Sequence, residues 1–341
     1  KIDPWFLEQI KEIVDCETQL KTKGLPRDFS EFNRIKSIGF SDKKLSELTK
    51  TSEEIVRRKR SALKILPVYK KVDTCAAEFK SFTPYMYSTY QRNFSINSEC
   101  EADPSNKKKI IILGGGPNRI GQGIEFDYCC CQASFSLKDA GFETIMVNCN
   151  PETVSTDYDT SDRLYFEPLK EEYVFNIIKK EQEKGNLIGV IAQFGGQTPI
   201  KLAKFLHDNK LPILGTQYTS IDLAEDRDRF RSLLNKLKLK QAESGIAKTF
   251  NQAIKIADKI GLPLMVRPSY VLGGRAMEIV HEKNQLKKFV EEAFKAAEEN
   301  PILIDKFIDH AMEVDVDAIS DGKQVHVCLL YTSPSPRDDC P

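Results

Sequence analysis

A glycine-rich segment between a buried strand and a helix constrains the fold of this chain more than any other stretch. The apolar run 110–113 is followed by the glycine-rich segment 114–123 and then by a helical pattern over 126–140. A strand, a glycine-rich turn and a helix in this order begin a doubly wound α/β unit. The alternation continues with predicted strands at 144–148, 187–193 and 212–214 and predicted helices at 170–180 and 199–208. We therefore predict a mainly parallel sheet with helices on both faces.

The glycine-rich segment itself matches neither standard phosphate-binding motif. A dinucleotide fingerprint needs glycine where Arg119 stands, and a P-loop needs Lys followed by Ser or Thr where Gln122 and Gly123 stand. The helix that follows turns its N-terminus toward the segment, which favours an anion. Taken alone, the segment is weak evidence for a nucleotide.

Residues 1–105 have a mainly helical pattern. Asp3 is a cap and Pro4 suits the first turn of a helix that Gly24 and Pro26 end. Shorter helices are predicted at 28–37, 41–50 and 52–63, and residues 68–106 are predicted to be irregular. The basic run 57–60 has the composition of a nucleic-acid patch, but four basic residues on one helix are more typical of a solvated face. A small helical domain of this kind is typical of assembly or docking.

A third region begins after residue 218. Helices are predicted at 221–237, from a cap at Asn251 to Gly261, and at 283–299, with strands at 302–307 and 313–319. The last strand alternates, so that Val314, Val316 and Ala318 face one way and Glu313, Asp315 and Asp317 face the other. Those three carboxylates are solvated, accept hydrogen bonds from a ribose, or line a metal site.

The segment 267–275 joins two strand-like runs of this third region. Arg267 and Arg275 bracket Gly273 and Gly274. Glycine lets a loop approach a ligand closely, and guanidinium groups grip phosphate oxygens in a forked geometry. We interpret the segment as a flap over a polyphosphate, and the alternative is an ordinary hairpin with two solvated arginines.

Composition bounds the partners and the compartment. Fifty basic residues balance 50 acidic residues, which argues against electrostatic binding to nucleic acid or to a membrane surface. No run of 18 apolar residues and no signal-peptide pattern is present, so we expect a cytoplasmic protein. The nine cysteines contain no C-x-x-C pair, which favours reduced, mostly buried thiols over disulfides or zinc.

Several of these strings together resemble the carbamoyl-phosphate synthase large-chain family. They are the stretches 114–130, 147–159, 195–199, 224–227, 267–275 and 313–317. The resemblance covers residues 1 to about 327 and extends to the bacterial type that hydrolyses glutamine. Members of this family contain two ATP-grasp synthetase halves, and a helical oligomerisation domain precedes the second half. The resemblance implies an α/β chain with a helical oligomerisation domain at 1–105, a doubly wound pre-ATP-grasp domain at 106–218 and a partial α+β ATP-grasp domain at 219–327.

The same resemblance implies a ligase reaction and a set of site residues. The first half makes carbamate from bicarbonate, ammonia and ATP, and the second half phosphorylates carbamate with another ATP, for arginine and pyrimidine biosynthesis. By matching positions, Arg227 and Arg267 contact ATP phosphates and are the catalytic candidates. Gly273 and Gly274 form the flap, Lys306 and Ile308 bind the adenine end partly through backbone groups, and Glu313 holds the ribose. The implied partners are a glutaminase small subunit, the first synthetase half and further copies of the chain through the helical domain.

Two departures from the family pattern limit this reading. The family's ligands for Mg²⁺ or Mn²⁺ lie beyond Glu313 in segments that this sequence does not contain, so we expect the chain to be inactive alone. From about Cys328 the family pattern stops, and we interpret the Ser-Pro-rich stretch 328–341 as a disordered, non-family tail that arose as an artefact. The alternatives are another ATP-grasp ligase of the biotin carboxylase type, which lacks the string 148–159, and a noncatalytic assembly fragment.

Overall fold

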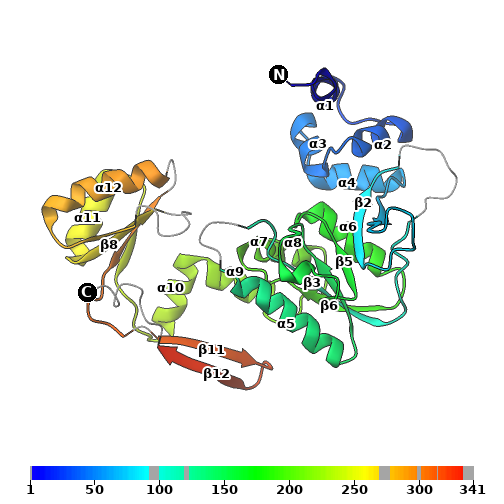
Figure 1. Ribbon diagram of the computed structural model, residues 1–341. Helices are drawn as coiled ribbons and strands as arrows, with labels where there is room; N and C mark the ends of the chain where they lie inside the picture. Colours follow the sequence, from blue (N-terminus) through cyan, green and yellow to red (C-terminus); the bar gives the residue numbers. More distant parts are fainter. Residues whose placement is uncertain are drawn as a thin grey trace. The chain divides into compact units, whose positions relative to one another are not determined.

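The computed structural model describes residues 2–91, 100–118, 123–268, 277–297, 301–312 and 314–332. It divides into two compact units, Lys1–Phe230 and Arg231–Pro341, which we describe one at a time (Figure 1). The first unit contains a group of helices and a six-stranded sheet, and the second contains a four-stranded sheet and a two-stranded ribbon.

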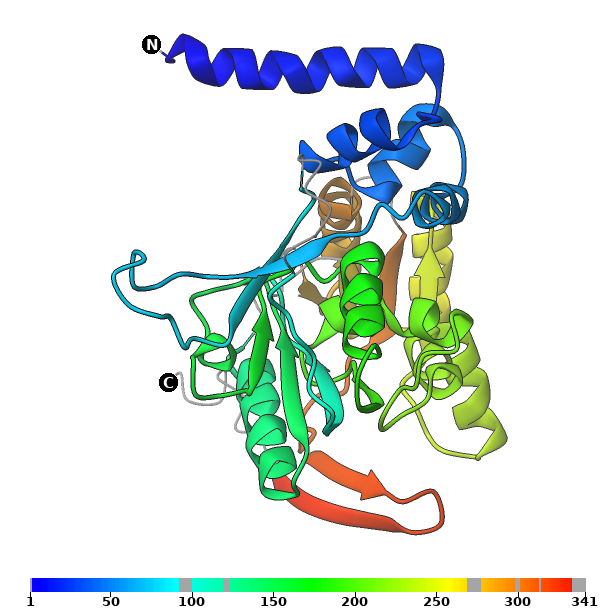
Figure 2. The same cartoon turned by 90° about the vertical axis from the view of Figure 1, so that its right-hand side faces the viewer.

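Four helices begin the first unit, as the sequence predicted. They are α1 (Pro4–Lys23), α2 (Phe29–Ser37), α3 (Asp42–Thr49) and α4 (Glu53–Ala62). The side chain at each N-cap accepts a hydrogen bond from a backbone N–H of the first turn, which satisfies one of the donors that a helix start leaves free. Figure 2 shows α1 at the outer end of this unit, with the three short helices between it and the sheet.

The six-stranded sheet has the order β1-β2-β5-β4-β3-β6. Its parallel centre consists of β3 (Lys108–Leu113), β4 (Glu143–Val147), β5 (Arg163–Tyr165) and β6 (Asn186–Ile191). The helical elements are α5 (Glu125–Asp139), the short η1 (Val154–Thr156), α6 (Glu171–Glu181), α7 (Gln197–Ile200) and α8 (Ala203–Asp208). The predicted strand at 212–214 is reduced to one parallel bridge, between Val190 and Ile213.

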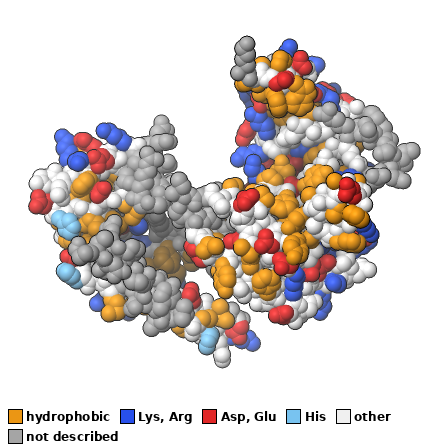
Figure 3. Space-filling model, viewed as in Figure 1, with side chains coloured by type: hydrophobic (Ala, Val, Ile, Leu, Met, Phe, Trp, Pro, Cys, Tyr) orange, Lys and Arg blue, Asp and Glu red, His pale blue; other side chains and the backbone are white. Residues whose placement is uncertain are grey.

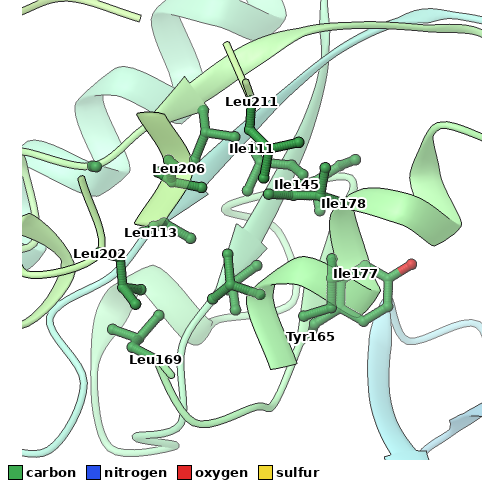
Figure 4. Close-up of a cluster of buried hydrophobic side chains, with 14 of the residues drawn as sticks. Ile111, Leu113, Ile145, Tyr165, Leu169, Ile177, Ile178, Leu202, Leu206 and Leu211 are labelled. Carbon is green, nitrogen blue, oxygen red and sulfur yellow. The ribbon is translucent and has the colours of Figure 1, made fainter. Parts of the chain in front are cut away.

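Residues on the two faces of this sheet belong to different cores, which confirms the doubly wound prediction. Ile111 and Leu113 of β3 pack with Ile177 and Ile178 of α6 and with residues of α8 (Figure 4). Ile112, one position along, packs on the opposite face with Cys130 of α5. Because side chains alternate along a strand, a β3 that is buried on both faces is an unbroken apolar run.

Two parts of the stretch 68–106 are strands and not irregular, and for these residues the prediction was wrong. β1 (Val68–Lys71) and β2 (Tyr85–Thr89) pair with each other in antiparallel fashion, and β2 then pairs in parallel with β5. The sheet therefore takes two of its strands from the region assigned to the helical domain. Both strands are short, and β1 ends in two lysines, so neither has a long apolar alternation that a sequence reading can detect.

The basic run on α4 is only partly the solvated face that was predicted, since Arg58 is 77% exposed but Arg60 is buried. Arg60 is only 1% exposed and forms an ion pair with Asp42, with 2.9 Å between Nη2 and Oδ2. The guanidinium of Arg57 lies 4.9 Å from the ring centre of Phe175 on α6. A buried cation needs a carboxylate and hydrogen-bond acceptors around it. Asp42 of α3 supplies the carboxylate, and Ile65 O, after the end of α4, accepts from Arg60 Nη1 at 2.9 Å.

The second unit has a four-stranded antiparallel sheet in the order β7-β10-β8-β9. Its strands are β7 (Ser244–Ala247), β8 (Leu264–Pro268), β9 (Glu278–Val280) and β10 (Ile302–Lys306). The helices α11 (Phe250–Ile260) and α12 (Lys283–Ala297) complete its core. The cap of α11 is Thr249 and not Asn251 as predicted, because the Thr249 hydroxyl accepts the hydrogen bond from Gln252 N.

The predicted helix 221–237 is two helices. α9 (Tyr218–Glu225) ends at Asp226, whose ψ of 108° is extended, and α10 (Arg227–Lys236) begins directly after it. Asp226 then acts as a cap, since its Oδ1 accepts a hydrogen bond of 2.9 Å from Arg229 N. An aspartate at this position both ends one helix and starts the next.

A two-stranded ribbon closes the described part of the second unit. β11 (Val314–Ser320) pairs with β12 (Val325–Thr332). The apolar side of β11 is not buried within the unit, since Val314 is 45% and Val316 is 54% exposed. β12 also continues four residues past Cys328, so the predicted disordered tail does not begin there. Residues 333–341 lie outside the described residues.

Candidate functional site

The sheet of the second unit has one face covered by helices and one face that α11 and α12 leave open. Leu264, Val266, Ile302 and Ile304 point to the covered face and belong to the core with α11 and α12. The alternate positions, Met265 and Arg267 on β8 and Leu303 and Asp305 on β10, share the opposite face. We call it the open face because α11 and α12 do not cover it, although Leu303 on it is only 4% exposed. Ser244 and Ile246 of β7 and Ile279 of β9 join them by register.

Arg267, a predicted phosphate ligand, lies on this open face and is paired with Asp305. The distance between Arg267 Nη2 and Asp305 Oδ2 is 2.7 Å, and the two side chains are 40% and 19% exposed. Arg267 Nε and Asp305 Oδ2 are buried, and neither makes a hydrogen bond of regular geometry with any described residue. The contact is therefore mainly one of charge, and part of the guanidinium remains free to bind an anion.

Lys306 points away from Arg267, to the covered side of the sheet. Its Nζ donates hydrogen bonds to Gly261 O at 3.1 Å and to Leu262 O at 2.6 Å, directly after the C-terminus of α11. A cation is favourable there because the last carbonyls of a helix carry partial negative charge. The side chain of Lys306 is thus engaged, and its backbone N–H donates to Glu243 O at 2.7 Å, so neither group is free for the predicted adenine contact.

The other predicted site residues are only partly described. Ile308 follows β10 and is 61% exposed. Arg227 begins α10, but its side chain lies outside the described residues, as do the whole of Gly273, Gly274 and Glu313. The structure therefore brings Arg267 and Lys306 onto neighbouring strands of one sheet and leaves the rest of the predicted set as a proposal. Asp305 was missed from the sequence, because only the register of β8 and β10 places it beside Arg267.

A second candidate site lies in the first unit, at the carboxyl ends of β3 and β4. A pocket of about 360 Å³ is lined by residues that include Gly115, Gly116, Asp127, Asn148 and Thr153. In open α/β sheets, ligands bind outside the carboxyl ends of the strands. The glycine-rich segment therefore faces a pocket, although its residues 119–122 lie outside the described residues.

Asn148 organises this pocket. Its side chain is buried, its Oδ1 accepts a hydrogen bond from Gly116 N at 3.0 Å, and its Nδ2 donates to Ser155 Oγ at 3.2 Å. Asp127 accepts from Ser155 N at 2.9 Å through Oδ2, while its Oδ1 is buried without a hydrogen-bond partner among the described residues. One amide side chain thus fixes the glycine turn against the loop after β4.

A close backbone contact explains one glycine of the Gly195-Gly196-Gln197 segment. A Cβ added to Gly195 would lie 2.3 Å from Gly114 O, far inside van der Waals contact. At Gly195 the backbone of the loop after β6 therefore lies against the backbone of Gly114, and only glycine allows that approach.

The eight cysteines in the described part of the chain are free. Cys16, Cys130 and Cys131 are buried, while Cys129 and Cys328 are exposed, so the prediction of mostly buried thiols holds for only three of them. Burial is the largest cause that raises the pKa of the Cys131 thiol to about 12, and it raises that of Cys130 further. Both thiols pack as small apolar groups.

Three family models match successive parts of the chain. They are the carbamoyl-phosphate synthetase large chain oligomerisation domain at 1–64, the carbamoyl phosphate synthase preATP-grasp domain at 106–223 and the carbamoyl-phosphate synthase L chain ATP binding domain at 226–333. Together they account for most of the sequence, in the order that the resemblance implied.

The chain belongs to the carbamoyl-phosphate synthase large-chain family. It is 55% identical to the carbamoyl phosphate synthase large chain of Rhizobium meliloti (strain 1021) over 348 residues and 58% identical to that of Xanthomonas campestris pv. campestris over 321 residues. These matches cover 96% and 94% of this chain but only 30% and 29% of the relatives. The chain therefore spans about a third of the length of the curated relatives that it matches.

Two solved structures have a fold similar to that of this chain. The biotin carboxylase domain of Hydrogenobacter thermophilus 2-oxoglutarate carboxylase, in complex with MgADP and bicarbonate, has a TM-score of 0.50 at 20% identity and covers 67% of this chain and 50% of its own. N5-carboxyaminoimidazole synthetase from Staphylococcus aureus has a TM-score of 0.51 at 18% identity and covers 68% of this chain and 56% of its own. At these identities the likeness shows the fold alone, so the biotin carboxylase alternative is supported only at that level.

Within the described residues, no helix is long and apolar enough to cross a membrane.

Proposed function

We propose that this chain provides the second synthetase half of a carbamoyl-phosphate synthase large chain, an ATP-grasp ligase that phosphorylates carbamate to carbamoyl phosphate. The observation that carries the proposal is the match of the ATP-binding-domain model to 226–333, in which Arg267 stands on an open sheet face. The order of the three matched domains supports the assignment to the second half, because the oligomerisation domain comes first.

Phosphoryl transfer of this kind depends on positioning and charge more than on a covalent nucleophile. A carbamate oxygen forms a bond to the γ-phosphorus of ATP while the bond to the β,γ-bridging oxygen breaks, which yields carbamoyl phosphate and ADP. Arg267 is partly free and is therefore suited to bind phosphate oxygens. We propose Arg227 as a second phosphate ligand and Gly273 and Gly274 as the flap over the phosphates.

The nucleoside end fits the end of β10. Ile308 is exposed and follows β10, and the Lys306 side chain is turned to the helix side. Lys306 N and Phe307 N already donate to Glu243 O and Pro263 O, so adenine would contact other backbone groups of 306–308 and the apolar side chains of the open face. Glu313 would hold the ribose. This arrangement orients the nucleotide without an additional charged side chain at the base.

A divalent metal would accompany the nucleotide, as Mg²⁺ accompanies ADP in the biotin carboxylase domain. Bound to the phosphates, Mg²⁺ or Mn²⁺ supplies charge neutralisation. The described residues contain no group of three His, Cys, Asp or Glu side chains that could hold a metal ion. We therefore assign no metal ligand in this chain and derive no step from it.

The proposed partners follow from the same assignment. We propose a glutaminase subunit as the source of ammonia and a first synthetase half as the source of carbamate, in the cytoplasm, for arginine and pyrimidine biosynthesis. We also propose that copies associate through the helical region. The N-terminal half of α1 supports this, because Trp5 (59%), Phe6 (57%) and Ile10 (57%) are exposed, and Figure 3 shows hydrophobic side chains at that end of the first unit.

Calorimetric titration of the chain with ATP and Mg²⁺ tests the nucleotide site. We expect binding that Arg267→Gln weakens about tenfold or more, since a hydrogen bond to a charged group is worth about 1.5–3 kcal/mol. Arg58→Gln is the matched control, because Arg58 is 77% exposed on α4 and pairs only with Glu54 in the described part of the chain. Equal affinity of the unchanged chain and Arg267→Gln would overturn the phosphate role of Arg267.

A further inference from the structure

The position of Asp305 follows from the register of two central strands. Arg267 lies directly opposite Leu303, and Asp305 lies opposite Met265. Arg267 and Asp305 are therefore diagonal neighbours on the open face, and a long side chain reaches across that diagonal. The 2.7 Å contact between Nη2 and Oδ2 confirms that the two side chains meet.

The environment of the pair differs from that of a surface ion pair. Asp305 is 19% exposed, and both Asp305 Oδ2 and Arg267 Nε are buried without a regular hydrogen bond among the described residues. A carboxylate in such a position has little water to hold it, so its main partner is the guanidinium. The remaining part of the guanidinium is exposed, with Arg267 40% accessible.

We propose that Asp305 is a positioning residue for the phosphate ligand Arg267, an inference that rests on the proposed function. Asp305 holds one side of the guanidinium against the sheet, so that the exposed side faces the polyphosphate in a single orientation. A flexible arginine loses rotamer freedom when it binds an anion, and a partner that has already fixed it reduces that loss. Asp305 itself does not touch the nucleotide phosphates.

The alternative is that Asp305 competes with the phosphates for Arg267. An aspartate that merely occupied Arg267 would have to release it before a phosphate could bind, and its own charge would repel the ligand. The geometry favours positioning. Asp305 reaches Arg267 Nη2 from the neighbouring strand β10, and the Arg267 side chain stays 40% exposed beside this contact. The two roles predict opposite effects of removing the charge.

A double-mutant cycle in this chain decides between them. The variants are Asp305→Asn, Arg267→Gln and the two together, with Asp309→Asn as the matched control, because Asp309 is 61% exposed and contacts only His310 in the described part of the chain. Calorimetry measures affinity for ATP with Mg²⁺ and for adenosine, which lacks phosphates. Thermal unfolding of each variant checks that the fold is intact.

We expect Asp305→Asn to weaken ATP binding about three- to tenfold, the size of effect that loss of preorganisation of one long side chain produces. Affinity for adenosine should not change, and Asp305→Asn should have no further effect in the Arg267→Gln background. A destabilised sheet would instead weaken ATP and adenosine together. The conservative Asp305→Glu should restore part of the ATP affinity.

The outcomes separate this inference from the proposed function. If Arg267→Gln weakens ATP binding but Asp305→Asn leaves it unchanged or strengthens it, Asp305 is not a positioning residue and the proposed function stands. The role of Asp305 would also be overturned if Asp305→Asn weakened ATP binding equally in the unchanged chain and in the Arg267→Gln variant. A parallel loss of affinity for adenosine would overturn it as well. No binding of ATP by the unchanged chain would overturn the proposed function and this inference with it.

Discussion

Arg60 and Asp42 form a bidentate ion pair in the interior of the first unit. Arg60 Nε lies 3.1 Å from both carboxylate oxygens of Asp42, Nη2 lies 2.9 Å from Oδ2, and both side chains are 1% exposed. Lys36 Nζ also donates to Asp42 at 3.0 Å and to Glu172 at 2.6 Å, while Glu172 accepts from Asp42 N at 2.6 Å. Because Glu172 lies on α6, this network joins the helices to the sheet.

Asp42→Asn should therefore destabilise the first unit. It would leave two buried cations with one carboxylate between them, and breaking a buried pair costs about 3–5 kcal/mol. Urea unfolding followed by circular dichroism measures the free energy of unfolding. Glu54→Gln is the control, because its partner Arg58 is exposed and such pairs contribute at most about 1 kcal/mol. A cost below about 1 kcal/mol for Asp42→Asn would show that the network does not stabilise this unit.

Glu167 gives a pH-dependent prediction. Its side chain is buried at 4% exposure, and burial raises its pKa above 4.5, although Ser88 N donates to it and lowers the pKa in part. A carboxyl whose pKa is higher in the folded state binds more protons when folded. Its contribution to stability is therefore complete below pH 4.5 and is lost as the pH rises through the folded pKa.

Glu167→Gln should remove this contribution. We expect the difference in unfolding free energy between the unchanged chain and the variant to favour the unchanged chain most at low pH and to shift toward the variant as the pH rises. Urea unfolding from pH 4 to pH 7 measures that difference. A difference that is constant across this range would contradict the buried, protonation-linked role of Glu167.

Gly195→Ala should disturb the contact between two loops of the first unit. The added Cβ would meet Gly114 O at 2.3 Å, and overpacking of this kind costs about 1–3 kcal/mol or more. Gly141→Ala is the control, because a Cβ added there would meet no atom of the described residues within 4 Å, and only the φ of +84° opposes the substitution. Thermal unfolding measures both. If Gly195→Ala left the chain as stable as before, the two loops would have to be able to separate freely.

The cysteine run should react unevenly with a disulfide reagent such as dithionitrobenzoate at pH 8. Cys129 is exposed, whereas burial raises the pKa of Cys131 to about 12 and so leaves almost no thiolate. We expect Cys129→Ser to remove one rapidly reacting thiol and Cys131→Ser to remove none. The release of thionitrobenzoate over time measures this, and rapid labelling of Cys131 in the folded chain would contradict its burial.

Secondary-structure elements could be predicted from the sequence where their hydrophobic pattern is long and lies within one segment. The unbroken run of β3 and the helical periodicity of α1 to α4 predicted elements that the structure confirms. β1 and β2 were not predicted because they have no long apolar alternation of their own. β1 pairs with β2, and β2 pairs with β5, which lies far along the chain. Arg60 was misread for a related reason, since its carboxylate partner comes from another helix.

The candidate site also combines a local pattern, which the sequence shows, with a contact between distant segments, which it does not. Residue types and spacing in the segment 267–275 predicted Arg267 as a phosphate ligand, which stays a prediction. Asp305 is 38 positions away in the sequence, and only the antiparallel register brings it to Arg267. The opposite directions of Arg267 and Lys306 follow from strand alternation, once the register is known. A single sequence contains that alternation but does not contain the register.

Methyl NMR of the chain with [¹³C]methyl-labelled methionine tests the central claim, that nucleotide binds on the open face. The chain has only five methionines, and Met265 lies on that face opposite Asp305, whereas Met86 and Met146 are buried in the first unit. Met265→Leu assigns the signal. We predict that ATP with Mg²⁺ shifts the Met265 methyl resonance, that Met86 and Met146 do not move, and that Arg267→Gln requires more ATP for the same shift. A Met265 signal that stays in place while ATP binds would contradict the account.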